Sequence, residues 1–134
     1  MIKLKDILLE GMKRKDIQSV IDRAYPQIVK NLGRARRGTP KVEMHSSIYV
    51  RVSGLEGAQG EANPHAEYEW DKNEIYLYLP KMINEEEVIR ALLHEYTHAT
   101  QDPKKMKEYR KLGYAKNPYE KAATRAEGNW KKYI

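Results

Sequence analysis

The sequence predicts an α+β fold in a single domain that covers residues 1–134. Apolar residues recur at helical spacing in the N-terminal and C-terminal parts of the chain. The middle of the chain instead alternates apolar and polar residues with a period of two, which is typical of strands. We therefore expect N-terminal helices, a small antiparallel sheet and two C-terminal helices.

The N-terminal region predicts two helices. The apolar residues of the first, which Gly11 ends, are Leu4, Ile7 and Leu8. The second is expected to begin with Asp16 as its N-cap and to end before Gly33. Its apolar residues at helical spacing are Ile17, Val20, Ile21, Ala24, Ile28 and Leu32. Pro26 lies within this pattern and is expected to kink or split the helix.

The sheet is expected from three segments with strand-like alternation. The apolar residues of the first segment are Val42, Met44, Ile48, Val50 and Val52. A glycine-containing loop, Ser53–Asn63, follows it. Ala66–Trp70 and Ile75–Leu79 then predict two strands that are joined by a short turn at residues 71–74.

A helix from about residue 84 to 101 has the clearest sequence signals. Asn84 is a favourable N-cap, and Glu87 occupies the position of a capping-box glutamate. Pro103 disfavours helical geometry at the preceding residue, so the helix should end near Gln101. Apolar residues cover much of its circumference, which predicts that the helix is buried between layers.

The last two turns of this helix contain the motif HExxH, with His94, Glu95 and His98. Four residues turn a helix by about 400°, so the two imidazoles project from nearly the same side, one turn apart. This arrangement suits a single metal ion, and Glu95 is close enough to contact a water molecule beside it. The alternative is a pair of hydrogen-bonded core histidines, but this does not explain a glutamate on a buried face.

A catalytic zinc site usually has three protein ligands, and the chain contains no cysteine. The third ligand must then be His, Asp or Glu. The extended metzincin motif is excluded because Gln101 and Lys104 occupy the positions of its glycine and its third histidine.

A second helix is expected downstream, with Asn117 as its cap and Pro118 at its first position. One stripe of this helix carries Glu120, Ala123, Thr124 and Glu127. The small side chain of Ala123 would let the helix approach another helix closely, so that Glu120 projects at the metal. We favour Glu120 as the third ligand, with Glu127 as the alternative. Glu120 could instead interact with the start of its own helix.

The segments HEYTHATQ and NPYEKAA resemble gluzincin metallopeptidases, and most closely the short stand-alone minigluzincins. The resemblance implies a zincin-like fold with one catalytic Zn²⁺ ion held by His94, His98 and Glu120. It also implies that Glu95 is the general base in peptide hydrolysis. Many gluzincins carry an aspartate three or four residues after the ligand glutamate, where it orients the first histidine. Those positions are Ala123 and Thr124 here, which leaves Glu127 available for that task.

The resemblance further implies that Ala66–Trp70 is the sheet edge along which a peptide substrate lies. Glu67 and Glu69 would then give the cleft an acidic rim that favours basic peptides. Gluzincins usually also supply a donor for the reaction's oxyanion, such as a tyrosine or histidine. The candidates for this donor are Tyr109, Tyr114, Tyr119 and His65.

The net charge of +6 offers a rival interpretation. The cations gather at residues 34–37 and 104–116, but no nucleic-acid motif accompanies them, so nucleic-acid binding is not expected. The alternative to a peptidase is a zinc-binding, weakly active or inactive protein that acts as a basic interaction module or a phage structural component. The opening segment, Met1–Leu9, resembles the starts of some tailed-phage structural proteins. The absence of a signal-like or transmembrane-length apolar segment predicts a cytoplasmic protein without a membrane partner, and an association with a phage is the alternative.

Overall fold

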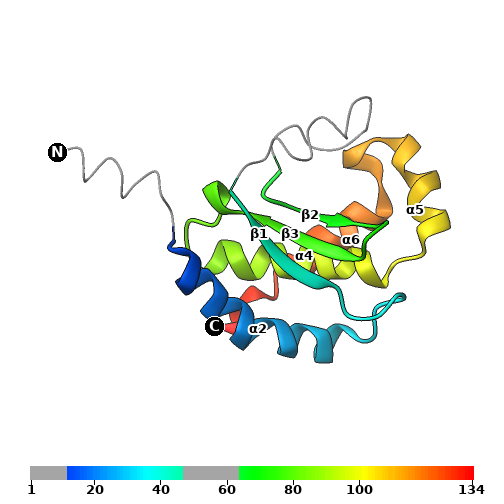
Figure 1. Ribbon diagram of the computed structural model, residues 1–134. Coiled ribbons are helices and arrows are strands. Elements are labelled where there is room, and N and C mark those ends of the chain that lie inside the picture. The colour runs from blue at the N-terminus through cyan, green and yellow to red at the C-terminus, as the bar shows by residue number, and fades with distance from the viewer. Residues whose placement is uncertain (1–11, 47–63) are drawn as a thin grey trace.

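The computed structural model describes residues 12–46 and 64–134 and shows an α+β arrangement (Figure 1). Its central element is helix α4 (Glu85–Thr100), which packs against α2 (Arg14–Leu32), α6 (Pro118–Glu127) and a sheet of three strands. The expected first helix around Leu4, Ile7 and Leu8 lies outside the described residues. No described helix is both long enough and apolar enough to cross a membrane.

The N-cap of helix α2 lies three residues earlier than the sequence predicts. Lys13 is its N-cap, and the carbonyl of Lys13 accepts hydrogen bonds from the amides of Asp16 and Ile17, both at 3.0 Å. Asp16 therefore lies in the first turn, where its negative charge complements the helix dipole, and the prediction that it caps the helix was wrong. The helix ends at Gly33, whose φ of 91° suits a glycine.

Pro26 does not split α2, which is a single helix over nineteen residues. A proline destabilises a helix because it removes one backbone hydrogen bond. The apolar residues on both sides of Pro26 are buried in one core, and the free energy gained by their burial outweighs this cost. The buried residues of α2 are Ile17, Val20, Ile21, Ala24 and Ile28. Their burial stabilises the helix on both sides of the proline.

The sheet is mixed, so the prediction of an antiparallel sheet was wrong. Strands β2 (Ala66–Glu69) and β3 (Glu74–Tyr78) form the expected antiparallel hairpin, with Ala66 opposite Leu77. Strand β1 (Lys41–His45) instead pairs with β3 in parallel, which gives the order β1-β3-β2. The period-two pattern shows which residues face the core, but it specifies neither the neighbour of a strand nor its direction. Ile48, Val50, Val52 and the loop 53–63 lie outside the described residues.

The core lies between the sheet and the helices α2 and α4. Ile75 and Leu77 of β3 are fully buried and belong to the same apolar cluster as the buried residues of both helices. Tyr96 of α4 is also fully buried, and its hydroxyl donates a 2.6 Å hydrogen bond to the carbonyl of Gly33. Packing on several sides therefore fixes the orientation of α4, and with it the direction of the side chains at the end of the helix.

A short helix that the sequence analysis missed, α5 (Pro103–Tyr109), follows α4 directly. Asp102 caps it by accepting a hydrogen bond from the amide of Lys104 at 2.9 Å. Most residues of α5 are charged, so the sequence gives little sign of the helix. Two of its other residues contact the rest of the molecule. Met106 accepts a hydrogen bond from the indole of Trp70, and the ring of Tyr109 packs edge-on against that of Tyr119. Short 3-10 helices lie at Leu79–Lys81, Arg110–Leu112, Tyr114–Lys116 and Trp130–Tyr133.

Candidate metal centre

The end of α4 presents three buried ionisable side chains. The helix starts as predicted, because Asn84 accepts a 2.9 Å hydrogen bond from the amide of Glu87, and it ends at Thr100 before Pro103. His94, Glu95 and His98 are only 9%, 7% and 7% exposed. Such burial is costly for ionisable groups unless they are paired, so the contacts of each side chain indicate its role.

Helix α6 brings a carboxylate to the two histidines. Asn117 caps the helix by accepting hydrogen bonds from the amides of Tyr119 and Glu120 at 2.9 and 3.4 Å. This cap leaves the Glu120 side chain available for other contacts. Ala123, one turn further along, is fully buried where α6 packs against α4.

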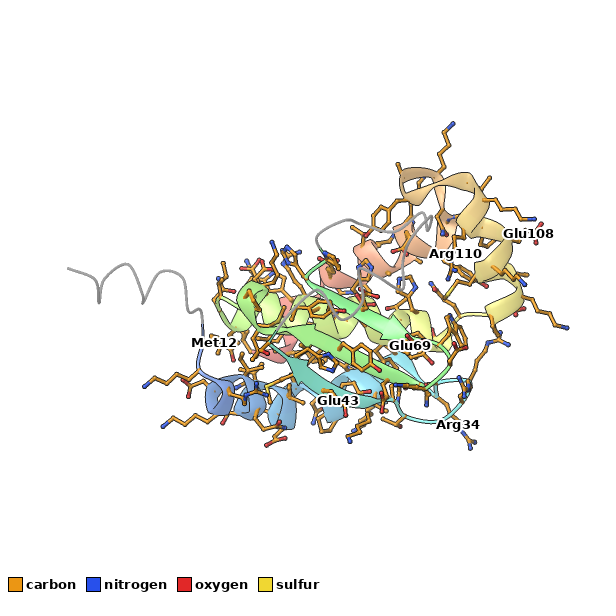
Figure 2. All side chains as sticks on the ribbon, turned by 45° about the horizontal axis from the view of Figure 1, so that its top comes forward. Met12, Arg34, Glu43, Glu69, Glu108 and Arg110 are labelled. Carbon is orange, nitrogen blue, oxygen red and sulfur yellow. The ribbon has the colours of Figure 1, made fainter. Side chains whose placement is uncertain are left out.

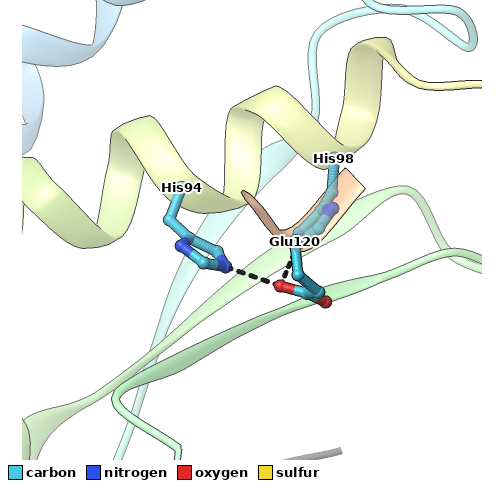
Figure 3. Close-up of side chains that lie close together, drawn as sticks. All are labelled: His94, His98 and Glu120. Carbon is cyan, nitrogen blue, oxygen red and sulfur yellow. Dashed lines mark hydrogen bonds and ion pairs between the residues drawn. The ribbon is translucent and has the colours of Figure 1, made fainter. Parts of the chain in front are cut away.

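Glu120 and the two histidines point toward one another (Figure 3). One oxygen of Glu120, Oε1, lies 3.1 Å from Nε2 of His94 and 3.2 Å from Nε2 of His98. The three potential ligand atoms all lie within 4.8 Å of one another. Among the described residues, this is the group of histidine and carboxylate side chains whose geometry could hold a metal ion.

The other ring nitrogen of each histidine also has a partner. Nδ1 of His94 is 2.7 Å from Oε2 of Glu127, and Nδ1 of His98 is 2.7 Å from Oε1 of Gln101. The Gln101 side chain is itself oriented by a 3.1 Å hydrogen bond from its Nε2 to the carbonyl of Tyr119. Both partners accept a hydrogen bond from Nδ1, so the Nε2 atom of each histidine is the one that faces Glu120.

Two imidazole lone pairs and a carboxylate cannot face one another without a cation between them. Among the protein groups alone, protons fill this role. Burial disfavours the charged form of His94, but the charge of Glu95 and hydrogen bonds to Glu120 and Glu127 raise its pKa to about 10. The pKa of His98 is raised in the same way, because contacts with Glu120 and Glu95 outweigh the effect of burial. Burial also disfavours the Glu120 carboxylate, yet its hydrogen bonds with both histidines lower its pKa to about 2.

This donor set fits a divalent metal ion. Two neutral imidazoles and one carboxylate are a common three-ligand set for zinc, which leaves a fourth position for water or substrate. Metal-binding histidines usually donate a hydrogen bond from their other ring nitrogen to an oxygen acceptor. Glu127 and Gln101 provide such acceptors for Nδ1 of His94 and of His98. A metal ion would replace the protons between the three groups.

Glu95 does not belong to the converging trio but lies beside it. Its side chain lines a cleft of about 380 Å³, together with His65, Ala66, Glu86, Glu87, Arg90, Ala91, His94, Tyr114 and Glu127. Burial raises the pKa of Glu95, against the opposing effect of the two histidines. A carboxyl group with a raised pKa at the wall of a cleft is suited to proton transfer.

The structure separates the four candidates for a donor to an oxyanion. His65 and Tyr114 line the cleft, whereas Tyr109 and Tyr119 pack against each other with ring centroids 5.0 Å apart. Tyr119 also accepts a hydrogen bond from the amide of Asp102 at 3.3 Å. The fourth histidine of the chain, His45, stacks on Tyr76 in the sheet and contributes nothing to the cleft.

Strand β2 lies at an edge of the described sheet and contacts α4. Ala66 of this strand lines the cleft. Glu67 accepts a 3.1 Å hydrogen bond from the hydroxyl of Tyr78, and its charge acts on Glu95. Neither Glu67 nor Glu69 is among the residues that line the cleft, so both could influence it only through their electric field.

Gln101 is the site residue that the sequence analysis did not assign. It follows His98 by three residues in the quoted segment HEYTHATQ, a spacing that brings two side chains to the same face of a helix. Gln101 is the C-cap of α4, and from the sequence it was assigned only as the residue near which the helix ends.

No protein-family model matches the chain, and comparisons with curated proteins and with solved structures found no match either. The likeness to zincin-like proteins therefore rests on the buried cluster of His94, His98 and Glu120 and on the helices that carry it.

Proposed function

We propose that the protein is a zinc-dependent peptidase of the gluzincin type. The observation that carries the proposal is the convergence of His94, His98 and Glu120 beside a cleft whose wall includes Glu95. Zinc would be held by the two Nε2 atoms and the Glu120 carboxylate. When bound, zinc supplies a Lewis acid that polarises a carbonyl group and lowers the pKa of water.

The chain's own side chains would perform the proton transfers. Glu95 would accept a proton from the water that attacks the scissile carbonyl, and would later donate that proton to the leaving amine nitrogen. Burial raises the pKa of this carboxyl group, which favours its uptake of a proton. His65 or Tyr114 would donate a hydrogen bond to the oxyanion, because both carry donors at the wall of the same cleft.

A peptide is the substrate that this cleft suits best. Ala66 connects the cleft to the edge strand β2, along which an extended chain can add through main-chain hydrogen bonds. The cleft-lining carboxylates are Glu86, Glu87, Glu95 and Glu127, against the single arginine Arg90. This excess of negative charge favours peptides with cationic side chains.

The test combines metal content with hydrolysis of a mixed peptide library by the zinc-loaded protein. We expect cleavage that a chelator abolishes and added zinc restores. Cleavage that Glu95→Gln leaves intact, or that the chelator does not affect, would assign the activity to another group or to a contaminant.

A basic interaction module is the second candidate, and a specific surface favours it. The segment 103–116 contains six exposed cations and one acid, Glu108. The cations are Lys104, Lys105, Lys107, Arg110, Lys111 and Lys116, and in the described part of the chain none of them forms an ion pair. Figure 2 shows Glu108 and other side chains of α5 extending outward from the molecule. Salt-dependent retention on immobilised single-stranded DNA that persists in chelator would favour this candidate.

A further inference from the structure

The carboxylate of Glu127 contacts two different partners. Oε2 accepts the hydrogen bond from Nδ1 of His94 at 2.7 Å, and Oε1 lies 3.7 Å from Nη1 of Arg90. Glu127 is the last residue of α6, where the negative end of the helix dipole disfavours a carboxylate. The neighbouring guanidinium of Arg90 offsets this effect and holds the carboxylate in one orientation.

Arg90 is held by three elements of the structure. It lies one turn before His94 on α4, and its Nε donates a 2.7 Å hydrogen bond to Glu86 of the same helix. Its guanidinium lies 5.8 Å from the centre of the Trp130 ring, in the 3-10 helix that follows α6. A guanidinium held against an aromatic ring and a carboxylate loses much of its rotational freedom.

From these contacts we infer that Arg90 is a positioning residue, which acts through Glu127 to orient His94 in the metal centre. Its effect on metal binding rests on the proposed zinc site. Arg90 holds the Glu127 carboxylate in one orientation, Glu127 accepts the hydrogen bond from Nδ1 of His94, and Nε2 of His94 then faces the metal. The ring of Trp130 couples the C-terminal segment to this chain of contacts.

The first measurement is the zinc affinity of Arg90→Met, by competition with a chromogenic chelator at neutral pH. Losing a direct partner of a ligating histidine costs about 10- to 100-fold, and Arg90 is one contact further away, so we expect a loss of about 3- to 10-fold. Arg125→Met is the matched control, because Arg125 is exposed on α6 and forms no ion pair within the described residues. Arg90→Lys keeps the charge and should recover part of the lost affinity.

A double-mutant cycle tests whether Arg90 acts through Glu127 or independently of it. If the inference is right, Arg90→Met causes no further loss of affinity once Glu127→Gln is present. An equal loss in both backgrounds would overturn it.

The proton on Nδ1 of His94 gives a readout that does not depend on zinc. In ¹⁵N-labelled protein its NMR signal should move in Arg90→Met and stay in place in Arg125→Met. An unmoved signal in Arg90→Met would overturn the inference. If the unsubstituted protein binds no zinc, the proposed function fails, and the NMR comparison still decides whether Arg90 positions Glu127.

Discussion

At the scale of single residues, the burial of Glu95 is the observation that favours our proposal of a catalytic site over a site that only binds metal. A helix packed on several sides gains nothing in stability from a buried carboxyl group, because burial disfavours the charged form. His94 and His98 offset part of this cost through their charges. The remaining cost is explained if Glu95 transfers a proton in the adjacent cleft.

Replacing Glu95 should therefore separate catalysis from metal binding. We expect Glu95→Gln to lower kcat/KM for a cleaved peptide by about 10²- to 10⁴-fold, the usual contribution of a general base, while zinc stays bound. Peptide hydrolysis and elemental zinc content, measured on the same preparation, check both parts. Glu108→Gln on the exposed face of α5 serves as the control. A parallel loss of zinc and activity in Glu95→Gln would contradict the assigned role.

The affinity for zinc should rise with pH, because zinc and protons compete for the same Nε2 atoms. The pKa of His94 is raised to about 10, so His94 carries a proton at neutral pH that zinc must displace. The affinity should increase up to about tenfold per pH unit for each proton released. Chelator competition between pH 6 and 8 measures the slope. An affinity that does not change over this interval would show that these histidines do not bind the ion.

At the scale of elements, the site depends on the close approach of α4 and α6. Ala123 of α6 is fully buried, and its small side chain leaves room for this close approach. Ala123→Leu should lower the free energy of unfolding by about 1–3 kcal/mol through overpacking, and should also weaken zinc binding. Thermal unfolding and chelator competition test this, with Ala115→Leu at an exposed position as the control. If Ala123→Leu is destabilised but binds zinc with unchanged affinity, the metal site does not depend on the close approach of the two helices.

The edge strand β2 gives a second prediction at this scale. Reversing two charges with Glu67→Lys and Glu69→Lys should weaken cleavage of Lys- and Arg-rich peptides relative to neutral ones, because the field near Glu95 becomes less negative. The ratio of the kcat/KM values for paired peptides measures the effect. The same charge change at the exposed Asp22 and Glu108 is the control. If the two double variants have equal selectivity, the charges of Glu67 and Glu69 do not contribute to substrate recognition.

Local sequence signals were sufficient where a feature depends on residues close together in the chain. Asn84 and Asn117 cap their helices as predicted, and HExxH has the spacing that brings both histidines to one side of α4. The parallel pairing of β1 with β3 depends on residues far apart in the sequence, so the alternation of side chains could not reveal it. Helix α5 was missed because its cap and its two packing residues stand among many lysines.

The same distinction applies within the site. Glu120 and Glu127 share a stripe of α6, so the sequence left both open as the third ligand. The fold separates them, since Glu120 faces both Nε2 atoms and Glu127 faces Nδ1 of His94. Which side of an imidazole a carboxylate meets depends on the packing of two helices, and no local pattern encodes it.

At the scale of the whole molecule, metal and fold should stabilise each other. The three proposed ligands come from two helices that are separated in the sequence, so an ion bound by all three links the end of α4 to the start of α6. Zinc should therefore raise the melting temperature, by an amount that grows with its free concentration above the Kd. Differential scanning calorimetry with a chelator and with graded zinc tests this, and Glu120→Gln should show a smaller rise.

The number of zinc ions bound per chain is the most direct test of the proposed metal site. Elemental analysis of protein purified without added metal, and again after zinc is offered and the excess removed, should give about one zinc ion per chain. His98→Ala, treated identically, should retain far less. A chain that holds no zinc even after zinc is offered would contradict the account, and the basic surface of residues 103–116 would then be the feature to pursue.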